Sequence, residues 1–413
     1  MTERAVNRPS LAVCTPWYPS LGNPVLGNFV ADWSRLAAGA YDVSVIHHTE
    51  WPGGPAELVA AHGPAFDALI ARMGRAGKLT SRGDFGQIVR VPHALVGGWS
   101  VPERAESAVA ATRRALTPLE AEVVHGHVGY FGGLVAVRLA DPQARVVVTE
   151  HSSELGNVLA DAKGVEIYDE VLERAAYLTC VTTGVRDLLV EKLPRHADKL
   201  LVVPNPVDFD ASPRRASRPE RLDRWVFVGG LAPIKGVHRL VKAFALFAAD
   251  RPEARLDLFG DGPLRAELED LVAEKGLKQR VAFHGNVPRA TVLAALPRFD
   301  VLVAPSLLET FHLAVPEAVA AGLPVVVTRS GGPEEAIGET MRLCGRFVDV
   351  NDDAAELADG VRAVEADLPS LDLDLARAEL AARYGVDAVR ERLGELYGSP
   401  ALRQGAGRPA QET

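Results

Sequence analysis

The fold of this chain is decided by residues 305–332, PSLLETFHLAVPEAVAAGLPVVVTRSGG. The overlapping run Asp300 to Ser306, DVLVAPS, is short and apolar, as expected of a buried strand. VPEAVAAG then favours a helix that Gly322 closes, and PVVVT favours a second, β-branched strand. The order of strand, loop, helix and strand is typical of a parallel sheet covered by helices.

Two glutamates in this stretch, Glu309 and Glu317, are eight residues apart. Within one helix, which turns by about 100° per residue, they would lie about 80° apart around the axis and would not converge neatly. The strand, loop and helix reading instead sets Glu309 in the loop and Glu317 in the first helical turn. That turn exposes N–H groups and a partial positive charge, which favour an anion such as a diphosphate. A carboxylate on each side of such a site is suited to holding sugar or ribose hydroxyls.

Length and composition indicate a globular protein of two domains. The chain has 413 residues, and domains of about 200 residues each are typical for this length. A hydrophobic content of 47% and a charged content of 24% provide material for two packed cores. The net charge of −9 argues against a general nucleic-acid binder, although it leaves a local basic face possible.

The cysteines indicate neither a disulfide framework nor a zinc site. Cys14, Cys180 and Cys344 are odd in number, far apart and free of any CxxC spacing. We therefore expect a reducing, cytoplasmic location, no metal and no cofactor. The sequence contains no apolar run of about 18 residues that would span a bilayer. Loose contact with a membrane surface and the oligomeric state both stay open.

Apolar runs alternate with helical patterns along nearly the whole chain, which predicts an α/β fold of two doubly wound, Rossmann-like domains facing a cleft. The strands expected in the first domain are 11–15, 42–47, 123–127, 145–150, 177–181 and 200–203. Those expected in the second begin at Trp225 and continue with 255–260, 280–285, 301–305, 324–328 and 346–350.

We predict five segments: an N-terminal domain at 1–208, a linker at 209–224, a C-terminal domain at 225–372, a helical segment at 373–397 and a disordered tail at 398–413. The linker is rich in Pro, Arg and Ser and lacks periodicity. An irregular patch at about 74–98 is expected to be a long loop or insertion.

The opening stretch resembles the signature of the retaining nucleotide-sugar glycosyltransferases of family 4. In that family two glutamates eight apart flank a Phe-containing loop and an Ala/Gly-rich helix, followed by a PVV strand and a Gly-Gly turn before an acidic residue. Here the last features are 324–326, Gly331, Gly332 and Glu334. The resemblance implies the GT-B fold, with the final helix crossing back to the first domain. It also implies a nucleotide-sugar donor and transfer without a metal.

The second domain offers a cation for the donor. Lys235 follows the strand and the pair Gly229 and Gly230, and it stands at the start of an amphipathic helix. A diphosphate needs positive charge and N–H donors, and this position supplies both. In the family an Arg usually occupies the place of Gly230 and shares the diphosphate with the lysine. This departure from the pattern weakens the expected donor site unless another cation substitutes.

The resemblance implies further donor contacts in glycine-rich turns and in the glutamate loop. Thr310 would be strained if the loop needed φ > 0 there, and His312 would add a hydrogen-bond donor near a phosphate or sugar. The resemblance implies that Gly27 lies against the diphosphate or the acceptor and that Asn286 and Val287 contact the base. Further donor contacts are implied for Gly260, Thr310, Phe311, His312 and Leu313.

The first domain supplies the acceptor side. His125 and His127 end one strand and share its face, and we favour His127 for function, because it matches the family's cleft histidine and its neighbour would pack. His151 ends the next strand and resembles the Thr-x-His of the family. Asn205 stands where the family has Asn-Gly, although Pro206 replaces that glycine. Supporting or acceptor-side roles follow for His151 and Asn205.

The leading hypothesis is a retaining, metal-independent glycosyltransferase with His127, Lys235 and Glu309 as catalytic residues and a small or lipid-linked acceptor. Fixed N–H groups and Lys235 would stabilise the leaving diphosphate. No carboxylate is clearly placed as a nucleophile, and the resemblance favours a same-face mechanism. Two alternatives stay open: a nucleotide-sugar 2-epimerase, and a catalytically impaired glycosyltransferase that serves as a binding subunit.

Overall fold

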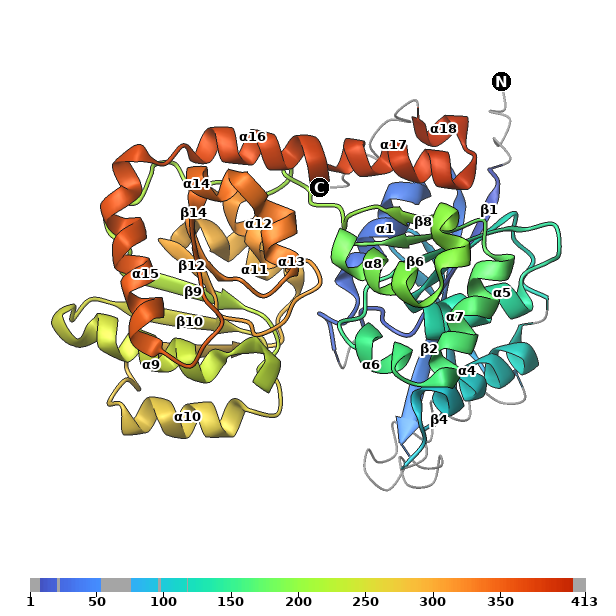
Figure 1. Ribbon diagram of the computed structural model, residues 1–413, viewed down its shortest axis with the longest axis horizontal. Helices are drawn as coiled ribbons and strands as arrows, with labels where there is room; N and C mark the ends of the chain where they lie inside the picture. Colours follow the sequence, from blue (N-terminus) through green and yellow to red (C-terminus); the bar gives the residue numbers. More distant parts are fainter. Residues whose placement is uncertain (1–7, 21–22, 53–75, 96–97, 117, 404–413) are drawn as a thin grey trace. The chain divides into compact units, whose positions relative to one another are not determined.

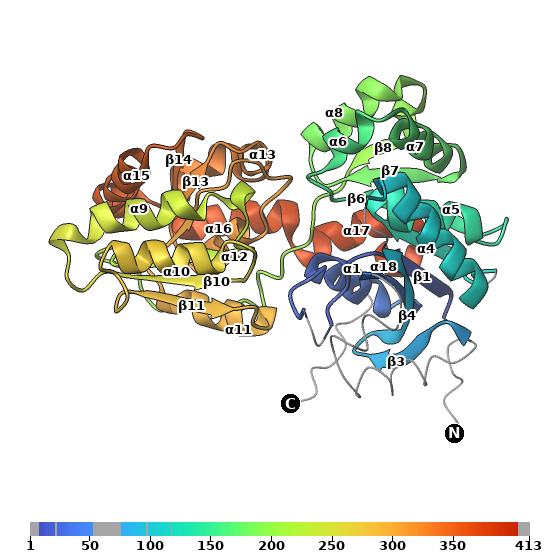
Figure 2. The same cartoon turned by 90° about the horizontal axis from the view of Figure 1, so that it is seen from below.

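The computed structural model describes residues 8–20, 23–52, 76–95, 98–116 and 118–403. By its contacts the chain divides into two compact units. Unit 1 comprises Met1–Tyr18, Gly27–Pro204 and Val389–Thr413, and unit 2 comprises Pro19–Leu26 and Asn205–Ala388. Each unit is a sheet with helices on both faces (Figures 1 and 2).

Unit 1 is built on an eight-stranded sheet with the order β3-β4-β2-β1-β5-β6-β7-β8. Its pairings are parallel except between β3 and β4. The strands are β1 Ser10–Thr15, β2 Asp42–Pro52, β3 Leu79–Gly83, β4 Gly86–Leu95, β5 Val123–His127, β6 Arg145–Glu150, β7 Tyr177–Cys180 and β8 Leu200–Val202. The helices are α1 Asn28–Ala38, α4 Val101–Ala115, α5 Leu134–Leu139, α6 Leu155–Leu159, α7 Ala162–Arg174, α8 Thr183–Lys192, α17 Val386–Tyr397 and α18 Pro400–Arg403.

Unit 2 is built on a six-stranded, wholly parallel sheet with the order β11-β10-β9-β12-β13-β14. The strands are β9 Arg224–Val228, β10 Arg255–Phe259, β11 Val281–Gly285, β12 Val301–Ala304, β13 Val325–Thr328 and β14 Gly345–Val348. The helices are α9 Val237–Phe247, α10 Arg265–Glu274, α11 Arg289–Ala295, α12 Ala314–Ala320, α13 Gly332–Ile337, α14 Met341–Cys344, α15 Ala354–Asp367 and α16 Leu373–Tyr384.

Both cores follow from strands that are apolar on both sides. In unit 1, all five residues of β5 are buried, and β6 is buried from Val146 to Glu150. In unit 2, Trp225 and Phe227 of β9 pack with Phe244 and Phe247 of α9 in one cluster. Sheets buried on both faces need such continuous apolar strands, and these runs are what made the α/β class predictable.

The strand predictions are confirmed, and two strands were missed. Every strand predicted from an apolar run is present. The patch at 74–98, expected to be a loop, contains the hairpin of β3 and β4 within its described part, and β4 pairs with β2 along its whole length. Gly83, Gly86 and Pro92 make this patch look irregular, because glycine and proline usually interrupt strands. In the structure Gly83 ends β3, Gly86 begins β4, and Pro92 lies within β4, the strand next to the edge of the sheet.

The C-terminal helix returns to unit 1, as the resemblance implied. In α17, the Leu396 carbonyl accepts a hydrogen bond from Arg145 Nε at 2.6 Å, and the Tyr397 ring meets Tyr41 edge-on. The predicted disordered tail is wrong for residues 398–403, because α18 forms there and buries Leu402. The rest of that tail, residues 404–413, lies outside the described residues.

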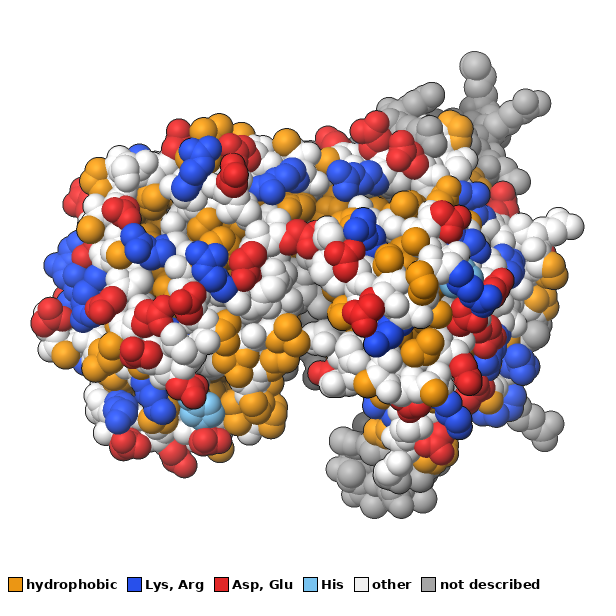
Figure 3. Space-filling view, viewed as in Figure 1, with side chains coloured by type: hydrophobic (Ala, Val, Ile, Leu, Met, Phe, Trp, Pro, Cys, Tyr) orange, Lys and Arg blue, Asp and Glu red, His pale blue; other side chains and the backbone are white. Residues whose placement is uncertain are grey.

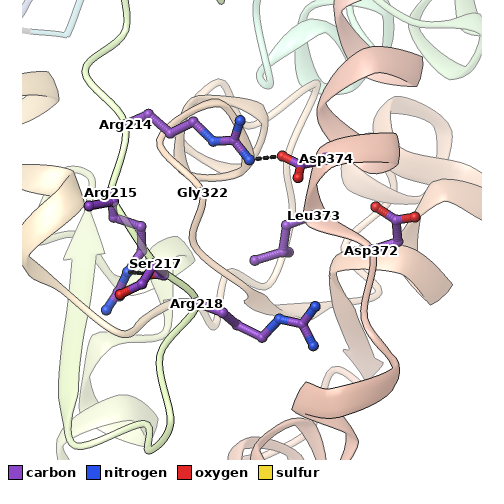
Figure 4. Close-up of a pocket in the computed structure, with 9 residues that line it drawn as sticks. Arg214, Arg215, Ser217, Arg218, Gly322, Asp372, Leu373 and Asp374 are labelled. Carbon is purple, nitrogen blue, oxygen red and sulfur yellow. Dashed lines mark hydrogen bonds and ion pairs between the residues drawn. The ribbon is translucent and has the colours of Figure 1, made fainter.

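The predicted linker, 209–224, packs on unit 2. Leu222 is fully buried, and Arg215 donates to the Phe299 carbonyl and lies 3.4 Å from Asp300. The segment borders a hollow of about 430 Å³, seen in Figure 4, that Gly322 and the start of α16 close. Phe299 and Gly322 precede strands, so this hollow lies at the amino ends of the unit 2 strands. Ligand sites of doubly wound sheets lie at the opposite, carboxyl edge.

On the face seen in Figure 3, acidic and basic side chains are interspersed over the described parts of both units. No described helix combines the length and the apolar character needed to cross a membrane.

Candidate functional site

The topology marks one place in each unit where strand order reverses. In unit 2, β9 is flanked by β10 on one side and β12 on the other, and in unit 1, β1 is flanked by β2 and β5. Helices leave in opposite directions at such a point, which opens a crevice beyond the carboxyl ends of the strands. The predicted residues Lys235 and Glu309 follow β9 and β12, and Gly27 and His127 lie after β1 and at the end of β5.

Lys235 and Glu309 meet at the switch point of unit 2. Lys235 Nζ lies 2.7 Å from Glu309 Oε1, to which Ser306 Oγ also donates at 2.7 Å. His312 Nε2 lies 3.4 Å from the same oxygen. The Glu309 side chain is only 9% exposed, so this carboxylate is a buried charge stabilised by a cation and a hydroxyl. The sequence predicted Lys235, Glu309 and His312 for this site and missed Ser306.

Burial and charge set the protonation of this cluster in opposite directions. Burial, the largest effect on Glu309, raises its pKa, but His312, Lys235 and Ser306 together outweigh burial and hold that pKa below its ordinary value. Burial lowers the pKa of His312 more than Glu309 raises it, so the imidazole is neutral at pH 7. The cluster therefore favours the charged form of Glu309 and the neutral form of His312.

Backbone bonds hold the glutamate loop in place. Glu309 N donates to the Ser330 carbonyl at 2.9 Å, and Gly332 N donates to the Glu309 carbonyl at 3.0 Å. Leu307 N donates to the Ile234 carbonyl at 2.7 Å, which joins this loop to the turn that carries Lys235. Strands β9, β12 and β13 thus fix the two charged residues by main-chain contacts.

The glutamate loop contains a residue with a positive φ, and it is His312, at 64°, and not Thr310. Non-glycine residues in this region are uncommon, and the strain is a mark of functional loops. Phe311 is buried and packs edge-on against Tyr384 of α16 at 5.2 Å between centroids. Leu313 precedes α12, which has seven residues and is followed by Gly322 in the left-handed conformation, as predicted.

The glycine turns after β9, β10 and β11 lie against one another. Gly229 N donates to the Phe259 carbonyl and Gly260 N donates to the Gly285 carbonyl, both at 2.9 Å. A Cβ on Gly260, where φ is 136°, would lie 2.0 Å from the Gly229 carbonyl oxygen, so only glycine fits. Gly230 is exposed, and a Cβ there would have only the Asp261 carbonyl within 4 Å, at 3.8 Å. Beyond Gly285, Asn286 is exposed and Val287 half-buried.

The second glutamate is held by an arginine that the sequence reasoning missed. Arg289, at the start of α11 and just after the Asn286–Val287 turn, donates from Nε to Glu317 Oε1 at 2.8 Å, and its Nη2 pairs with the same oxygen. Glu317 is 5% exposed. The ion pair of Arg289 with Glu317 therefore joins the segment after this turn to the second glutamate. The position of Arg289 just after this turn was the feature of the sequence from which a role in the site could have been inferred.

In unit 1 the predicted histidines come together. His127 Nδ1 lies 2.9 Å from His151 Nε2, and the rings stack at 5.2 Å. The His125 ring also stacks on the His127 ring, with the centroids 4.2 Å apart. Trp33 of α1 meets the His127 ring edge-on, at 6.1 Å between centroids. The pKa of His127 lies well below its ordinary value, mainly through burial and then through both neighbouring histidines. His127 Nε2 has no hydrogen-bond partner among the described residues.

The backbone beside His127 is strained. Val128 is β-branched, fully buried and has φ of 66°, and it opens the π-helical turn Val128–Gly133. Gly129 N donates to Glu150 Oε2 at 2.8 Å, and the backbone N–H groups of His151 and Ser152 donate to Glu150 Oε1 at 2.8 and 2.7 Å. One buried carboxylate thus holds the loops that follow both His127 and Glu150.

The remaining predicted residues are placed near their strand ends. Gly27 precedes α1 with φ of 67°, and a Cβ there would lie 2.3 Å from the Trp17 carbonyl. Asn205 is buried after β8. His125, expected to pack, bonds to Tyr397 of α17 through Nδ1 at 2.6 Å.

One group of described residues has the ligand types and spacing that a metal ion would need: Asp169, Glu173 and His196, at α7 and the turn before β8. Arg195 pairs with both carboxylates there. The group is held by its own cation and does not include the residues that the sequence predicted for the site.

Two families match this chain over adjoining ranges. Residues 208–378 match the family described as glycosyl transferases group 1, and residues 29–211 match the family described as glycosyltransferase family 4. The two matches meet at the junction between the two sheets, so the sheet of unit 2 and most of that of unit 1 are each accounted for.

Similar proteins include a 2-deoxystreptamine glucosyltransferase from Streptomyces kanamyceticus, 32% identical over 228 residues, which are 52% of this chain and 58% of that enzyme. The chain thus spans less than two thirds of the length of this relative. Among solved structures, sucrose-phosphate synthase from Thermosynechococcus elongatus has a TM-score of 0.71 at 21% identity, covering 95% of this chain and 98% of that one. The Anabaena HepE protein in complex with UDP and glucose has a TM-score of 0.63 at 16% identity, covering 94% and 99%.

Proposed function

We propose that this chain, which belongs to the family 4 glycosyltransferases of the GT-B fold, moves a sugar from a nucleotide-diphosphate donor to a hydroxyl of an acceptor, with retention and without a metal. The observation that carries the proposal is the Lys235–Glu309 pair at the switch point of unit 2. The pair sets a cation and a carboxylate side by side. A glycosyl diphosphate offers an anionic diphosphate to the first and sugar hydroxyls to the second.

Each charged group has a distinct task in the proposed reaction. Lys235 and the N–H groups at the start of α9 take the diphosphate and stabilise the charge that grows as the glycosidic bond breaks. Glu309, released from Lys235, then accepts hydrogen bonds from sugar hydroxyls. Glu317, oriented by Arg289, holds the ribose hydroxyls next to the base-side turn.

Unit 1 supplies the sugar-side histidine in this proposal. A buried nitrogen without a partner is costly, and His127 Nε2 would find one in a donor-sugar hydroxyl. We assign retention to a same-face reaction in which the diphosphate helps to deprotonate the acceptor. The three cysteines are buried and unpaired, which fits a reducing compartment, and we propose a cytoplasmic location.

The donor site is tested by ligand-induced stabilisation. UDP-, GDP-, ADP- and TDP-sugars are screened for a rise in melting temperature, beginning with UDP-glucose, since a ligand that binds the native state stabilises it by mass action. Lys235→Met should abolish that rise. Lys242→Met, which removes an exposed lysine of the following helix α9, should keep it. An equal rise in both variants would contradict the assignment of Lys235.

Products separate the proposed transfer from the alternatives. A transferase releases nucleotide diphosphate in step with a glycosylated acceptor, whereas a 2-epimerase yields an epimerised sugar without acceptor. Glu309→Gln should lower transfer at least about a hundredfold, the usual effect of losing a key transition-state hydrogen bond. Donor binding without turnover on any acceptor would instead favour a binding subunit.

A further inference from the structure

A chain of hydrogen bonds runs from the C-terminal helix to the stacked histidines of unit 1. Tyr397 Oη lies 2.6 Å from His125 Nδ1, and His125 Nε2 lies 2.7 Å from Thr149 Oγ1. Thr149 Oγ1 lies 2.7 Å from Thr179 Oγ1, which is 3.3 Å from the Val148 carbonyl oxygen. All four side chains are buried, so each hydrogen must find its acceptor within the protein.

Counting hydrogens along this chain assigns its direction. The Val148 carbonyl can only accept, so Thr179 donates to it, and Thr149 then donates to Thr179. Thr149 therefore accepts from His125 Nε2–H, which leaves His125 Nδ1 bare to accept from the Tyr397 hydroxyl. The reverse direction would leave the Tyr397 hydrogen without an acceptor among the described residues.

The protonation states agree with this assignment. Burial lowers the pKa of His125 to about 3 and raises the pKa of Tyr397 well above its ordinary value, so both side chains are neutral at pH 7. A neutral imidazole with hydrogen on Nε2 and a protonated phenol are the two partners that the chain needs.

The chain of hydrogen bonds fixes the His125 ring, and the His127 ring stacks on the face of that ring. Their rings are 4.2 Å apart at an angle of 29°, and Trp33 meets both rings edge-on, at 5.6 and 6.1 Å. His127 is tied through Nδ1 to His151 on its other side. These contacts hold the His127 ring at its face, at its edge and through Nδ1. The direction in which its remaining nitrogen, Nε2, points is therefore fixed.

We propose that Tyr397 of the C-terminal helix and His125 are positioning residues that hold the His127 ring for the donor sugar. The proposal rests on the proposed function through the role of His127, while the hydrogen-bond chain itself stands on the structure. The crossing helix α17 then contributes to the reaction in addition to completing the fold of unit 1.

Tyr397→Phe tests this by removing one oxygen and leaving the ring in place. We expect kcat to fall between about threefold and tenfold, the worth of one net hydrogen bond, while KM for the donor stays nearly unchanged. The ¹⁵N resonance of His125 Nδ1 should move toward that of an unbonded imidazole nitrogen. The matched control is Tyr41→Phe, because Tyr41 packs on the same Tyr397 ring and its hydroxyl bonds to Ser399, outside the chain.

The outcomes separate cleanly. If Tyr397→Phe and Tyr41→Phe share the same kcat and the same His125 resonances, the inference is wrong. If Tyr397→Phe fails to fold, Thr149→Val decides, since it cuts the chain on the other side of His125 and should lower kcat in the same way. If the wild-type protein transfers no sugar, the proposed function fails, and the His125 resonance still tests the chain.

Discussion

Gly230, in the turn after β9, occupies the position at which the family that the sequence resembles usually has an arginine. The turn backbone has no positive φ at this residue, and a Cβ there would contact only the Asp261 carbonyl, at 3.8 Å. A side chain is therefore sterically allowed at 230, in contrast to Gly260, where a Cβ would lie 2.0 Å from a carbonyl oxygen. The absence of the arginine is not forced by packing.

Gly230→Arg should strengthen donor binding. A guanidinium at this turn would add a charge-assisted hydrogen bond to the diphosphate, worth about 1.5 to 3 kcal/mol, so the Kd of the nucleotide diphosphate should fall at least about tenfold. Isothermal titration calorimetry measures this. Gly230→Ala adds the Cβ without the charge and should bind as the wild type does. Equal affinities in the two variants would show that the turn does not face the diphosphate.

At the residue scale, spacing predicted the charged partners but not the contacts that orient them. Lys235 and Glu309 are 74 positions apart and still meet, because both follow strands that flank the switch point. Arg289 and Tyr397 were missed, since an ion pair or a hydrogen bond between distant side chains leaves no periodic trace in a sequence. His312 lies beside Glu309, and the positive φ for which the sequence left both Thr310 and His312 open falls on His312.

At the scale of elements, the start of α9 determines where Lys235 stands. Gly236 precedes the helix with φ of 63°, and a Cβ there would lie 2.2 Å from the Pro305 carbonyl oxygen. This close approach brings the turn after β9 against the end of β12, which is the contact that unites the two halves of the candidate site. A larger residue would force these strand ends apart.

Gly236→Ala should destabilise the protein by more than about 2 kcal/mol and weaken donor binding, because it combines a strained backbone with a clash. Urea unfolding gives the change in the free energy of unfolding. Gly276→Ala is the control, since Gly276 also has a positive φ, at 69°, but open space around it, and it should cost about 1 kcal/mol. If the clash at residue 236 contributes, Gly236→Ala must lower the free energy of unfolding by more than Gly276→Ala does. Equal losses in the two variants would contradict it.

Element types were predictable wherever strands are apolar on both faces, and least so at the sheet edge. β3 is exposed at three of its five residues, and β4 contains Pro92, so neither shows the apolar run of a central strand. The pairing of β4 with β2 depends on residues about 40 positions upstream, which no local pattern reports. The short helix α18 was missed for a similar reason, because it is stabilised by burying Leu402.

At the scale of the whole molecule, buried histidines link stability to pH. Burial lowers the pKa of His47 to about 4 and the pKa values of His48, His125 and His151 to about 3. Unfolded histidine titrates near 6.5, so below that pH the unfolded chain binds more protons than the native one. The stability is complete above about pH 6.5 and is lost as the pH falls toward 4. The raised pKa of Glu150 opposes this loss, but the lowered pKa values of His127 and His312 add to it.

The free energy of unfolding should therefore fall steadily between about pH 6.5 and pH 4, by up to about 1.4 kcal/mol per pH unit for each buried histidine. Denaturant titrations at a series of pH values measure the slope. His48→Gln should reduce the slope by about 1.4 kcal/mol per pH unit, the contribution of one proton. A flat stability profile in this range would contradict the burial of these rings.

The pairing of Lys235 with Glu309 has a consequence for how the salt concentration affects binding at this site. The lysine already has a counter-ion within the protein, so binding of a diphosphate replaces one negative partner by another. Fewer small anions have to be displaced from the lysine than at a bare cation. Affinity for the proposed donor should accordingly depend only weakly on ionic strength.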